Sequence, residues 1–472
     1  MERLHKTPLL NQEIVTDSSR SLFEIICFCF AVFAILIANN VFFSIALIVP
    51  FLFLRDRFSI SLLAVFPVIE TAQIVATDVT ITKVISIFLG IIFAMEIISQ
   101  DKFFFGRGFV YLLSFFSIII LGILIALTSM NFGPIIDWNY AAVISQNLAV
   151  ISILLFTTVF YLFIRVRGLP FVVKSLSVAS KSISISIIVI TMYFVTRGNT
   201  PSNWWNVITR LSFTNADPND YASLLSILSV FSLHLIYSPN SKIWSVVGVI
   251  SYMLAFYSVY LTFSRGGLLT LIFAFVLSTI TFARKGNETL KAMFFVLLFL
   301  IIVIALSKTG VISSAAVYER FFGKYSSGNL SNFTSGRSDL WKAGLSVIWE
   351  RPIFGFGGSQ YSSLFVNLEK VGRPNVFHNL FLEILVQYGL AGFTIFFLII
   401  ARTFRGYFLI LRFYKRGKDP EGILLLPFIC LFTGLFAGLS LSWQWREMLW
   451  YFIAICLGVS DLLTTHRAHE KT

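Results

Sequence analysis

Long apolar runs separated by short polar connections make up most of this chain of 472 residues. Hydrophobic residues account for 57% of the chain and charged residues for only 12%, so a soluble fold could not cover its surface with polar side chains. An apolar run of about 18 residues is long enough to cross a bilayer as a helix. The sequence therefore predicts an all-α polytopic membrane protein with about 12–14 transmembrane helices. The predicted spans are roughly 22–37, 41–54, 58–76, 83–99, 108–128, 145–164, 183–195, 220–236, 243–262, 266–283, 291–307, 378–401, 423–440 and 447–461.

The distribution of Lys and Arg predicts the orientation. The first run follows a polar stretch and lacks a small-residue cleavage site, so we expect it to be an uncleaved helix. If the N-terminus is cytoplasmic, basic residues gather in every second connection and at the C-terminus, as the positive-inside rule requires. The residues on this side are Arg3, Lys6, Arg20, Arg55, Arg57, Lys102, Arg107, Arg165, Arg167, Lys174, Lys181, Lys242, Arg284, Lys285, Lys291, Arg402, Arg405, Arg412, Lys415, Arg416, Lys418, Arg467 and Lys471.

Because successive connections alternate between the two sides of the membrane, the remaining ones are predicted to face the outside, at roughly 129–144, 196–219, 263–265 and 308–377. The last of these is the only long one, and we expect it to be a structured external loop on a single membrane domain that spans residues 1–472. The net charge of +13 then reflects the positive-inside bias and attraction to anionic lipid, and no nucleic-acid partner is expected. All four cysteines fall within apolar runs, which argues against disulfides and zinc sites.

Arg265 departs from this charge pattern. It lies in Thr262-Phe263-Ser264-Arg265-Gly266-Gly267, which joins two apolar runs with almost no loop on the predicted outer side. An arginine this close to hydrocarbon costs about 2.5–3.5 kcal/mol on insertion scales unless it is paired or reaches the interface. The two glycines permit a tight turn and close approach of another backbone or a ligand. Arg265 is therefore a candidate ligand-binding residue; the alternative is an arginine that extends to the lipid headgroups.

Arg210 lies in a second predicted outer connection, in an aromatic, partly apolar stretch that suits a re-entrant segment. Downstream, Asp217 and Pro218 are typical of a helix N-cap followed by proline at the first helical position. Asp220 would then interact favourably with the helix dipole. We therefore predict a structural role for the two aspartates and a binding role for Arg210.

The long external loop contains a predicted amphipathic helix that begins near Arg337 and ends at Pro352. Arg337, Trp341, Leu345 and Ile348 follow helical spacing, which predicts that they share one face directed at the membrane domain. Such a helix could hold the Arg337 guanidinium over a bound anion. The alternative is that the arginine packs its aliphatic stem beside the tryptophan.

His378 lies where the chain re-enters the predicted membrane region, immediately before Asn379. It is the only histidine that the predicted topology places on the outer side; the others are His5, His234, His466 and His469. A position at a helix start favours the neutral imidazole, which is the form that a general base needs. The alternative is a purely structural histidine.

The residue types that are missing from the outer connections narrow the chemistry. They contain no Gly-rich phosphate loop with a lysine, no cluster of metal ligands, and no carboxylate in the first connection at Ala38-Asn39-Asn40. Arginines would then have to neutralise a phosphate leaving group, which guanidinium groups can do by bidentate binding. A histidine would take the proton from an attacking hydroxyl. The pattern favours metal-independent sugar transfer from a polyprenyl diphosphate, with no cofactor.

Several short motifs follow one another in the second half of the chain, at roughly 205–400, and all of them fall on the predicted outer side or beside it. They are Asp217-Pro218-Asn219-Asp220-Tyr221-Ala222, Ser264-Arg265-Gly266-Gly267, Gly336-Arg337-Ser338-Asp339-Leu340-Trp341, Glu350-Arg351-Pro352, Phe354-Gly355-Phe356-Gly357-Gly358, His378-Asn379-Leu380 and Tyr388-Gly389-Leu390-Ala391-Gly392.

These motifs, in this order, resemble the O-antigen ligase/polymerase superfamily. The resemblance implies a glycosyltransferase-C-like membrane fold and inverting, metal-independent transfer of a glycan from undecaprenyl diphosphate. It also implies that His378 is the base, that Arg210 and Arg265 engage the diphosphate, and that Arg337 is the loop arginine, with Asn379 and Trp341 in supporting positions. The implied partners are an undecaprenyl-diphosphate-linked oligosaccharide, the bilayer, and flippase and chain-length regulator proteins.

Three functions remain open at this stage. The first is a polymerase at the outer face of the bacterial cytoplasmic membrane. The high helix count favours it, and so does the absence of a second histidine near His378, because the ligases of the superfamily that the chain resembles commonly have one. The second is a ligase that transfers the glycan to lipid A core or another surface acceptor. The third is a polysaccharide flippase or transporter, which predicts midplane charges and a two-halves repeat that the sequence does not display.

Overall fold

The computed structural model of the protein describes residues 18–38, 46–51, 58–69, 81–100, 105–129, 140–196, 217–238, 241–283, 337–357, 377–415, 419, 421–441 and 446–469. Within these ranges every regular element is a helix, which confirms the predicted all-α fold. The helices are α1 (Ser18–Ala38), α3 (Ser59–Ile69), α4 (Ile81–Ile98), α5 (Arg107–Ser129), α6 (Tyr140–Thr196), α7 (Pro218–Tyr237), α8 (Lys242–Leu261), α9 (Arg265–Phe282), α13 (Arg337–Ile348), α15 (Leu380–Lys415), η2 (Ile423–Leu425), α16 (Leu426–Ala437) and α17 (Glu447–His469).

Seven helices in the described part of the chain are long and apolar enough to cross a membrane, and they include α7, α8, α9 and α17. Shorter apolar helices occupy 22–37, 59–68 and 423–437. The protein is thus an all-α polytopic membrane protein. The predicted span at 291–307 lies outside the described residues, and the full number of spans stays a prediction.

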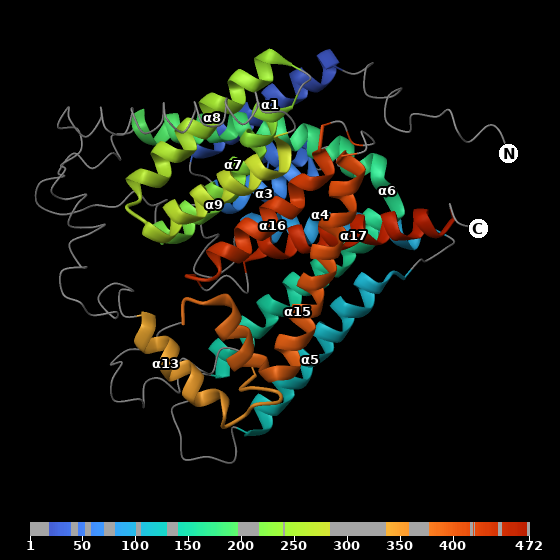
Figure 1. The fold of residues 1–472 in the computed structure, drawn as a ribbon, viewed down its shortest axis with the longest axis vertical. Helices are drawn as coiled ribbons and strands as arrows, with labels where there is room; N and C mark the ends of the chain where they lie inside the picture. Colours follow the sequence, from blue (N-terminus) through green and yellow to red (C-terminus); the bar gives the residue numbers. More distant parts are fainter. Residues whose placement is uncertain are drawn as a thin grey trace, which may run out of the picture.

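Helix α7 forms the centre of the bundle, between α6, α8, α9 and α16 (Figure 1). Its serines at every third position are fully buried, and they are Ser223, Ser226, Ser229 and Ser232. Ser232 hydrogen-bonds Ser184 of α6 at 3.2 Å and Ser251 of α8 at 2.7 Å. Small hydroxyl side chains let helices approach closely and bond one another where lipid offers no partner. This explains how a helix with so many serines can occupy the core.

Two helices bend sharply at glycines with positive φ. Helix α6 is kinked at Gly168 (φ 76°), two residues before Pro170, and α15 at Gly389 (φ 62°). The prediction of separate spans at 145–164 and 183–195 was wrong about the residues between them, because these continue as helix beyond the kink. They do so because Leu176 and Ala179 are fully buried there against neighbouring helices. The predicted span at 378–401 is likewise divided at Gly389.

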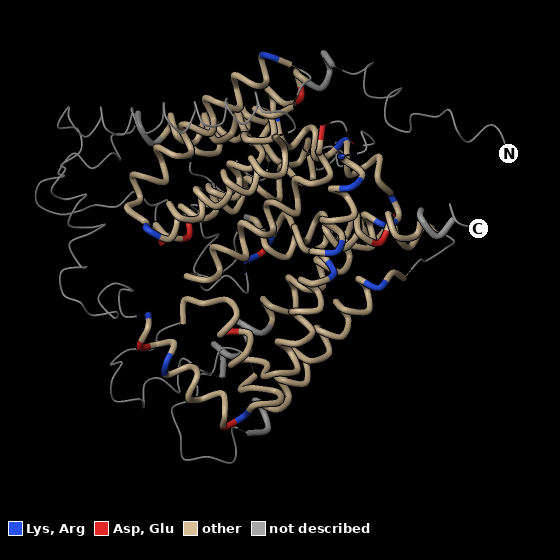
Figure 2. Tube along the Cα trace, in the orientation of Figure 1, with Lys and Arg blue, Asp and Glu red and all other residues tan. Residues whose placement is uncertain are grey.

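The helix ends gather at two opposite ends of the bundle. At one end, Leu380 N–H donates to Gly438 O at 2.7 Å and Ser264 Oγ donates to Asn219 Oδ1 at 2.8 Å, which joins α15, α16, α9 and α7. At the other end, Tyr414 Oη donates to Phe282 O at 3.0 Å. Most of the tube between these ends is uncharged, with charged residues at both ends and a few near the centre of the view (Figure 2). The predicted topology likewise places the connections alternately at the two ends of the bundle. The side of the membrane that each end faces stays a prediction.

The segment of residues 337–357, hereafter the α13 segment, lies across the C-terminal end of α5 and the N-terminal part of α15 (Figure 1). Four main-chain hydrogen bonds attach it at the α15 kink: Phe356 N to Val386 O, Gly357 N to Gln387 O, Leu390 N to Pro352 O and Ala391 N to Ile353 O. The bend at Gly389 frees these backbone groups for the contact, and a Cβ at Gly389 would overlap Ile353 O.

Candidate functional site

The turn between α8 and α9 places Arg265 at the first position of α9. Ser264 caps the helix, because its Oγ accepts from Gly267 N at 3.1 Å. A Cβ at Gly267 would overlap the Cβ of Ala222 in α7, so glycine is needed for the two helices to cross. The predicted tight turn and close backbone approach are therefore confirmed.

The first turn of α7 lies directly beside this turn. Asp217 caps α7, its Oδ1 accepting from Asn219 N at 2.8 Å, with Pro218 at the first helical position as predicted. Asn219 Oδ1 accepts from Ser264 Oγ at 2.8 Å and so fastens the two turns together. Asp220 forms an ion pair with Arg446 at the start of α17, which the sequence interpretation did not foresee.

Helix α13 begins at Arg337 and ends before Pro352, as predicted, but its buried face differs from the prediction. Leu345 is 54% exposed, whereas Leu340 and Gly344 are buried. The helix is turned because Gly344 packs against the ring of Phe377, which would lie 2.6 Å from a Cβ at that position. The predicted common face of Arg337, Trp341, Leu345 and Ile348 was therefore wrong at Leu345.

Trp341 and Asn379 hold the backbone on either side of His378. Trp341 Nε1 donates to Phe377 O at 2.9 Å. Asn379 Oδ1 caps α15 by accepting from the backbone N–H groups of Phe381 and Leu382 at 3.1 and 3.0 Å, and its amide donates to Leu439 O at 3.2 Å. His378 thus lies between two anchored residues.

His378 adopts a left-handed backbone conformation (φ 52°). Among the described residues, only one other non-glycine residue does so, Phe263 in the α8–α9 turn (φ 50°). Side chains disfavour this region, and such strain persists where the surrounding structure enforces it, often at functional sites. One of the two strained residues is thus the candidate base His378 itself, and the other, Phe263, lies two residues before Arg265.

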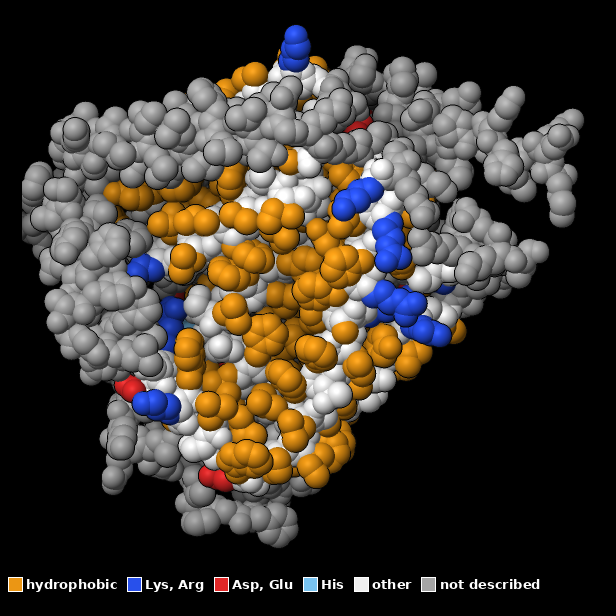
Figure 3. All heavy atoms as spheres, viewed as in Figure 1, with side chains coloured by type: hydrophobic (Ala, Val, Ile, Leu, Met, Phe, Trp, Pro, Cys, Tyr) orange, Lys and Arg blue, Asp and Glu red, His pale blue; other side chains and the backbone are white. Residues whose placement is uncertain are grey.

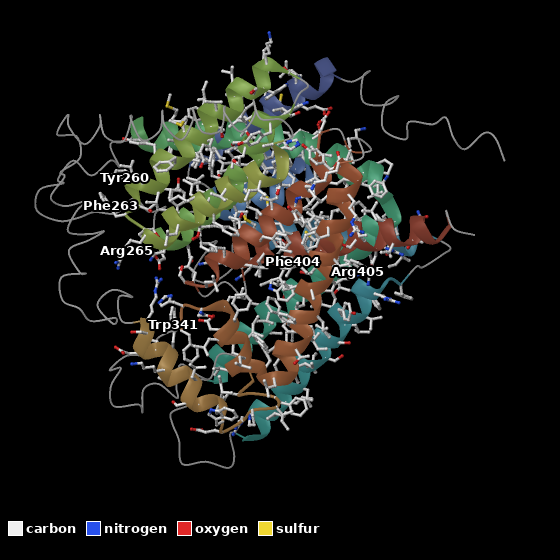
Figure 4. The ribbon with its side chains drawn as sticks, in the orientation of Figure 1. Tyr260, Phe263, Arg265, Trp341, Phe404 and Arg405 are labelled. Carbon is white, nitrogen blue, oxygen red and sulfur yellow. The ribbon has the colours of Figure 1, made fainter. Side chains whose placement is uncertain are left out.

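The cationic side chains and His378 converge electrostatically. Burial lowers the pKa of the half-buried Arg337; the Asp217 carboxylate opposes this and Arg265 adds to it. Burial also lowers the pKa of His378, Arg337 lowers it further, and Asp217 opposes both. Figure 4 shows Arg265 facing the end of α13 that carries Trp341. Two guanidinium groups and an imidazole whose pKa is lowered therefore share one end of the bundle, an arrangement that can bind an anion and accept a proton.

Two further expectations concern residues and ligands at this end. Arg210 lies outside the described residues. Among the residues that the structure does describe, no group of three or more His, Cys, Asp or Glu side chains is placed to hold a metal ion.

Asp217, which the sequence interpretation assigned only to capping, also acts on Arg337 and His378 through its charge. Its position within Asp217-Pro218-Asn219-Asp220, one of the motifs that carried the resemblance, was the available signal.

The fold and this cluster define a polytopic helical membrane protein with cations and a histidine gathered at one end of its bundle. Residues 250–397 match the family model described as O-antigen ligase, which confirms the resemblance to the O-antigen ligase/polymerase superfamily. The matched region contains Arg265, Arg337, Trp341, His378 and Asn379. No curated protein matches the chain. The family supports an O-antigen ligase/polymerase-type function in an integral membrane protein.

Proposed function

We propose that the protein is a metal-independent, inverting glycosyltransferase that polymerises polysaccharide repeat units. It would transfer the growing glycan from undecaprenyl diphosphate to a hydroxyl of a new lipid-linked unit at the outer face of the cytoplasmic membrane. The observation that carries this proposal is the convergence of Arg265, Arg337 and His378, which come from three separate segments of the family-matched region.

The proposed reaction assigns one step to each group. The acceptor hydroxyl oxygen forms a bond to the anomeric carbon from the face opposite the diphosphate, and His378 takes the hydroxyl proton. The bond between the anomeric carbon and the diphosphate oxygen breaks, and the electron pair leaves with the diphosphate. Arg265 and Arg337 stabilise that charge, with Arg210 as a third proposed contact. The lowered pKa of His378 favours the neutral imidazole, the form that a proton acceptor requires.

Trp341 and Asn379 would act as positioning residues, because each bonds the backbone beside His378 and neither needs to touch substrate. The proposed topology places both termini in the cytoplasm and the cation cluster outside. Flippase and chain-length regulator proteins are proposed as functional partners, since a polymerase uses units that have already crossed the membrane.

The test is the length of the surface glycan in a strain that lacks the gene and carries either the wild-type or the His378→Asn allele. Surface chains reduced to one repeat unit in the variant would support polymerisation. A normal surface pattern with the variant would exclude both transferase proposals and return attention to transport.

A ligase is the second candidate, and the description of the matching family favours it. The chemistry at the donor would be the same, and the acceptor would be lipid A core or another surface molecule. Full-length glycan that accumulates on the lipid carrier in the His378→Asn strain would identify a ligase.

A further inference from the structure

The α13 segment exposes a set of large apolar side chains opposite its buried face. Leu345 is 54% exposed, Trp349 80%, Ile353 60% and Phe354 37%. We name these four residues the exposed apolar surface of the segment. Scattered apolar residues on a protein surface need no explanation, but a contiguous group that includes a tryptophan marks an interaction surface.

This surface belongs to a segment with a well-packed interior. On the opposite side of α13, Leu340, Val347 and Ile348 are buried with Phe377 and Leu382. The four main-chain hydrogen bonds to the α15 kink hold the residues that follow the helix. The apolar side chains are therefore directed outward by a fixed backbone.

The exposed apolar surface is continuous with faces of the transmembrane helices that are also apolar and exposed. Ile353 O accepts from Ala391 N at 3.0 Å, beside Leu390, which is 52% exposed. From Leu390 the exposed row continues along α15 through Phe397 and Phe404. On the other side, the outer part of α5 exposes Leu121 and Leu124, and its Gly122 lies close to Gly357. Apolar side chains extend from the middle of the visible face towards its lower end (Figure 3).

Two chemical features identify lipid as the occupant. Trp349 is followed by Glu350 and Arg351, and an aromatic ring next to charged residues is typical of the boundary between acyl chains and headgroups. The exposed face of α13 also changes along its length, from Asp339 and Lys342 near the site to Leu345 and Trp349 at the far end. A helix that lies in the interface would show this pattern if only its far end entered the acyl region.

We propose that the exposed apolar surface of the α13 segment inserts into the outer leaflet of the membrane. The segment is then seated partly in lipid: the apolar side chains of its C-terminal end enter the outermost acyl region, Glu350 and Arg351 stay at the boundary with the headgroups, and the N-terminal end, which carries Arg337, lies at the level of the headgroups. This inference concerns the lipid contact and does not depend on the glycosyltransferase reaction.

The experiment measures the surroundings of single spin labels on the full-length protein in vesicles of phosphatidylcholine and phosphatidylglycerol, with the four native cysteines replaced by alanine. Labels are placed at Trp349→Cys and Ile353→Cys. Phe397→Cys, 61% exposed on α15, is the lipid reference, and Asp339→Cys, exposed on α13, is the aqueous reference. Collision with oxygen reports lipid, and collision with a neutral water-soluble nickel chelate reports water.

We expect the labels at positions 349 and 353 to collide with oxygen as the label at 397 does, and to be shielded from the nickel chelate that reaches position 339. Collision with nickel at 349 and 353 at the level of position 339 would overturn the proposal. Low collision with both reagents would also overturn it, because the surface would then be covered by protein. A melting temperature in detergent equal to that of the cysteine-free protein verifies that each labelled variant is folded.

Discussion

Two arginine sites at opposite ends of the bundle differ in how their charge is balanced. At one end, Arg402 and Asp461 are buried, with side chains only 8% and 3% exposed, and Arg402 Nη2 donates to Asp461 Oδ1 at 2.6 Å. Asp461 Oδ2 also accepts from Tyr161 Oη at 2.6 Å and Gly108 N at 2.8 Å. This network joins α5, α6, α15 and α17. At the opposite end, Arg337 is half-buried and is acted on by a second guanidinium, that of Arg265, as well as by Asp217.

The difference separates a structural arginine from a candidate binding arginine. A buried cation with a hydrogen-bonded carboxylate is already balanced within the protein, and the pair serves to connect helices. Guanidinium groups that gather with one another and with an imidazole raise the local positive potential, which favours an incoming anion. Substitutions at the two sites should therefore differ in whether they reduce turnover or stability.

Replacement of His378 should have the largest effect on turnover. We expect His378→Asn to reduce product formation by about 10²–10⁴-fold, the typical contribution of a general base. Asparagine tolerates the left-handed backbone at this position, so the melting temperature in detergent should stay at the wild-type value. Wild-type turnover in a reconstituted assay would remove His378 from the mechanism.

Removal of Asp461 should instead reduce stability. Asp461→Ala leaves the Arg402 guanidinium buried without its carboxylate, and we expect a loss of about 3–5 kcal/mol in the free energy of unfolding. Thermal or denaturant unfolding in detergent measures it, and turnover per folded molecule should change little. The double variant Asp461→Ala/Arg402→Met should regain much of the loss; equal losses in the single and double variants would contradict a role as an ion pair.

Arg265→Lys keeps the charge but removes the planar, bidentate donor group. If Arg265 binds phosphate oxygens, kcat/KM should fall about 10- to 100-fold, as expected for the loss of a charge-assisted hydrogen bond. Arg405→Lys is the matched control, since Arg405 is exposed on α15 well away from Arg265 (Figure 4). Equal activity of the two variants would indicate that Arg265 contributes only a point charge or none.

The pH dependence of activity should reveal the charges of Arg337 and Asp217, which shift the pKa of His378 in opposite directions. Protonation inactivates a general base, so activity is lost as the pH falls through the pKa of His378. Arg337 lowers this pKa and Asp217 raises it. Arg337→Gln should therefore move the acid limb of the normalised profile to higher pH, and Asp217→Asn, which retains a capping side chain, should move it to lower pH. Asp339→Asn should leave it in place; shifts of the same sign in the first two variants would contradict the assignment.

The features that the sequence predicted well depend on neighbouring residues. Asp217 and Pro218 define a helix start by their local chemistry, and Gly266 and Gly267 define a tight turn. For the same reason, Pro352 correctly marked the end of α13. Five of the six proposed site residues, Arg265, Arg337, Trp341, His378 and Asn379, lie in the described part of the chain. Each was proposed from topology or motif, and their positions relative to one another required the fold.

The features that were missed depend on contacts between distant segments. The buried face of α13 is set by Phe377, and the ion pair of Asp220 with Arg446 joins residues 226 positions apart. Arg402 was assigned to the cytoplasmic basic cluster, whereas it is buried against Asp461. A carboxylate within an apolar helix was the available signal, because such a group requires a partner in the membrane.

The attachment of the α13 segment to α15 has a consequence for how this part of the molecule can diverge. Its four hydrogen bonds join main-chain atoms only, and such bonds form regardless of which side chains the participating residues carry. Gly355 and Gly389 have little freedom to change, because a Cβ at either position would collide with the opposite backbone. Outward-facing positions such as 349, 353 and 354 are under no such restriction. Related proteins could therefore replace these side chains to suit membranes of different composition, while the backbone that supports Arg337 and His378 stays the same.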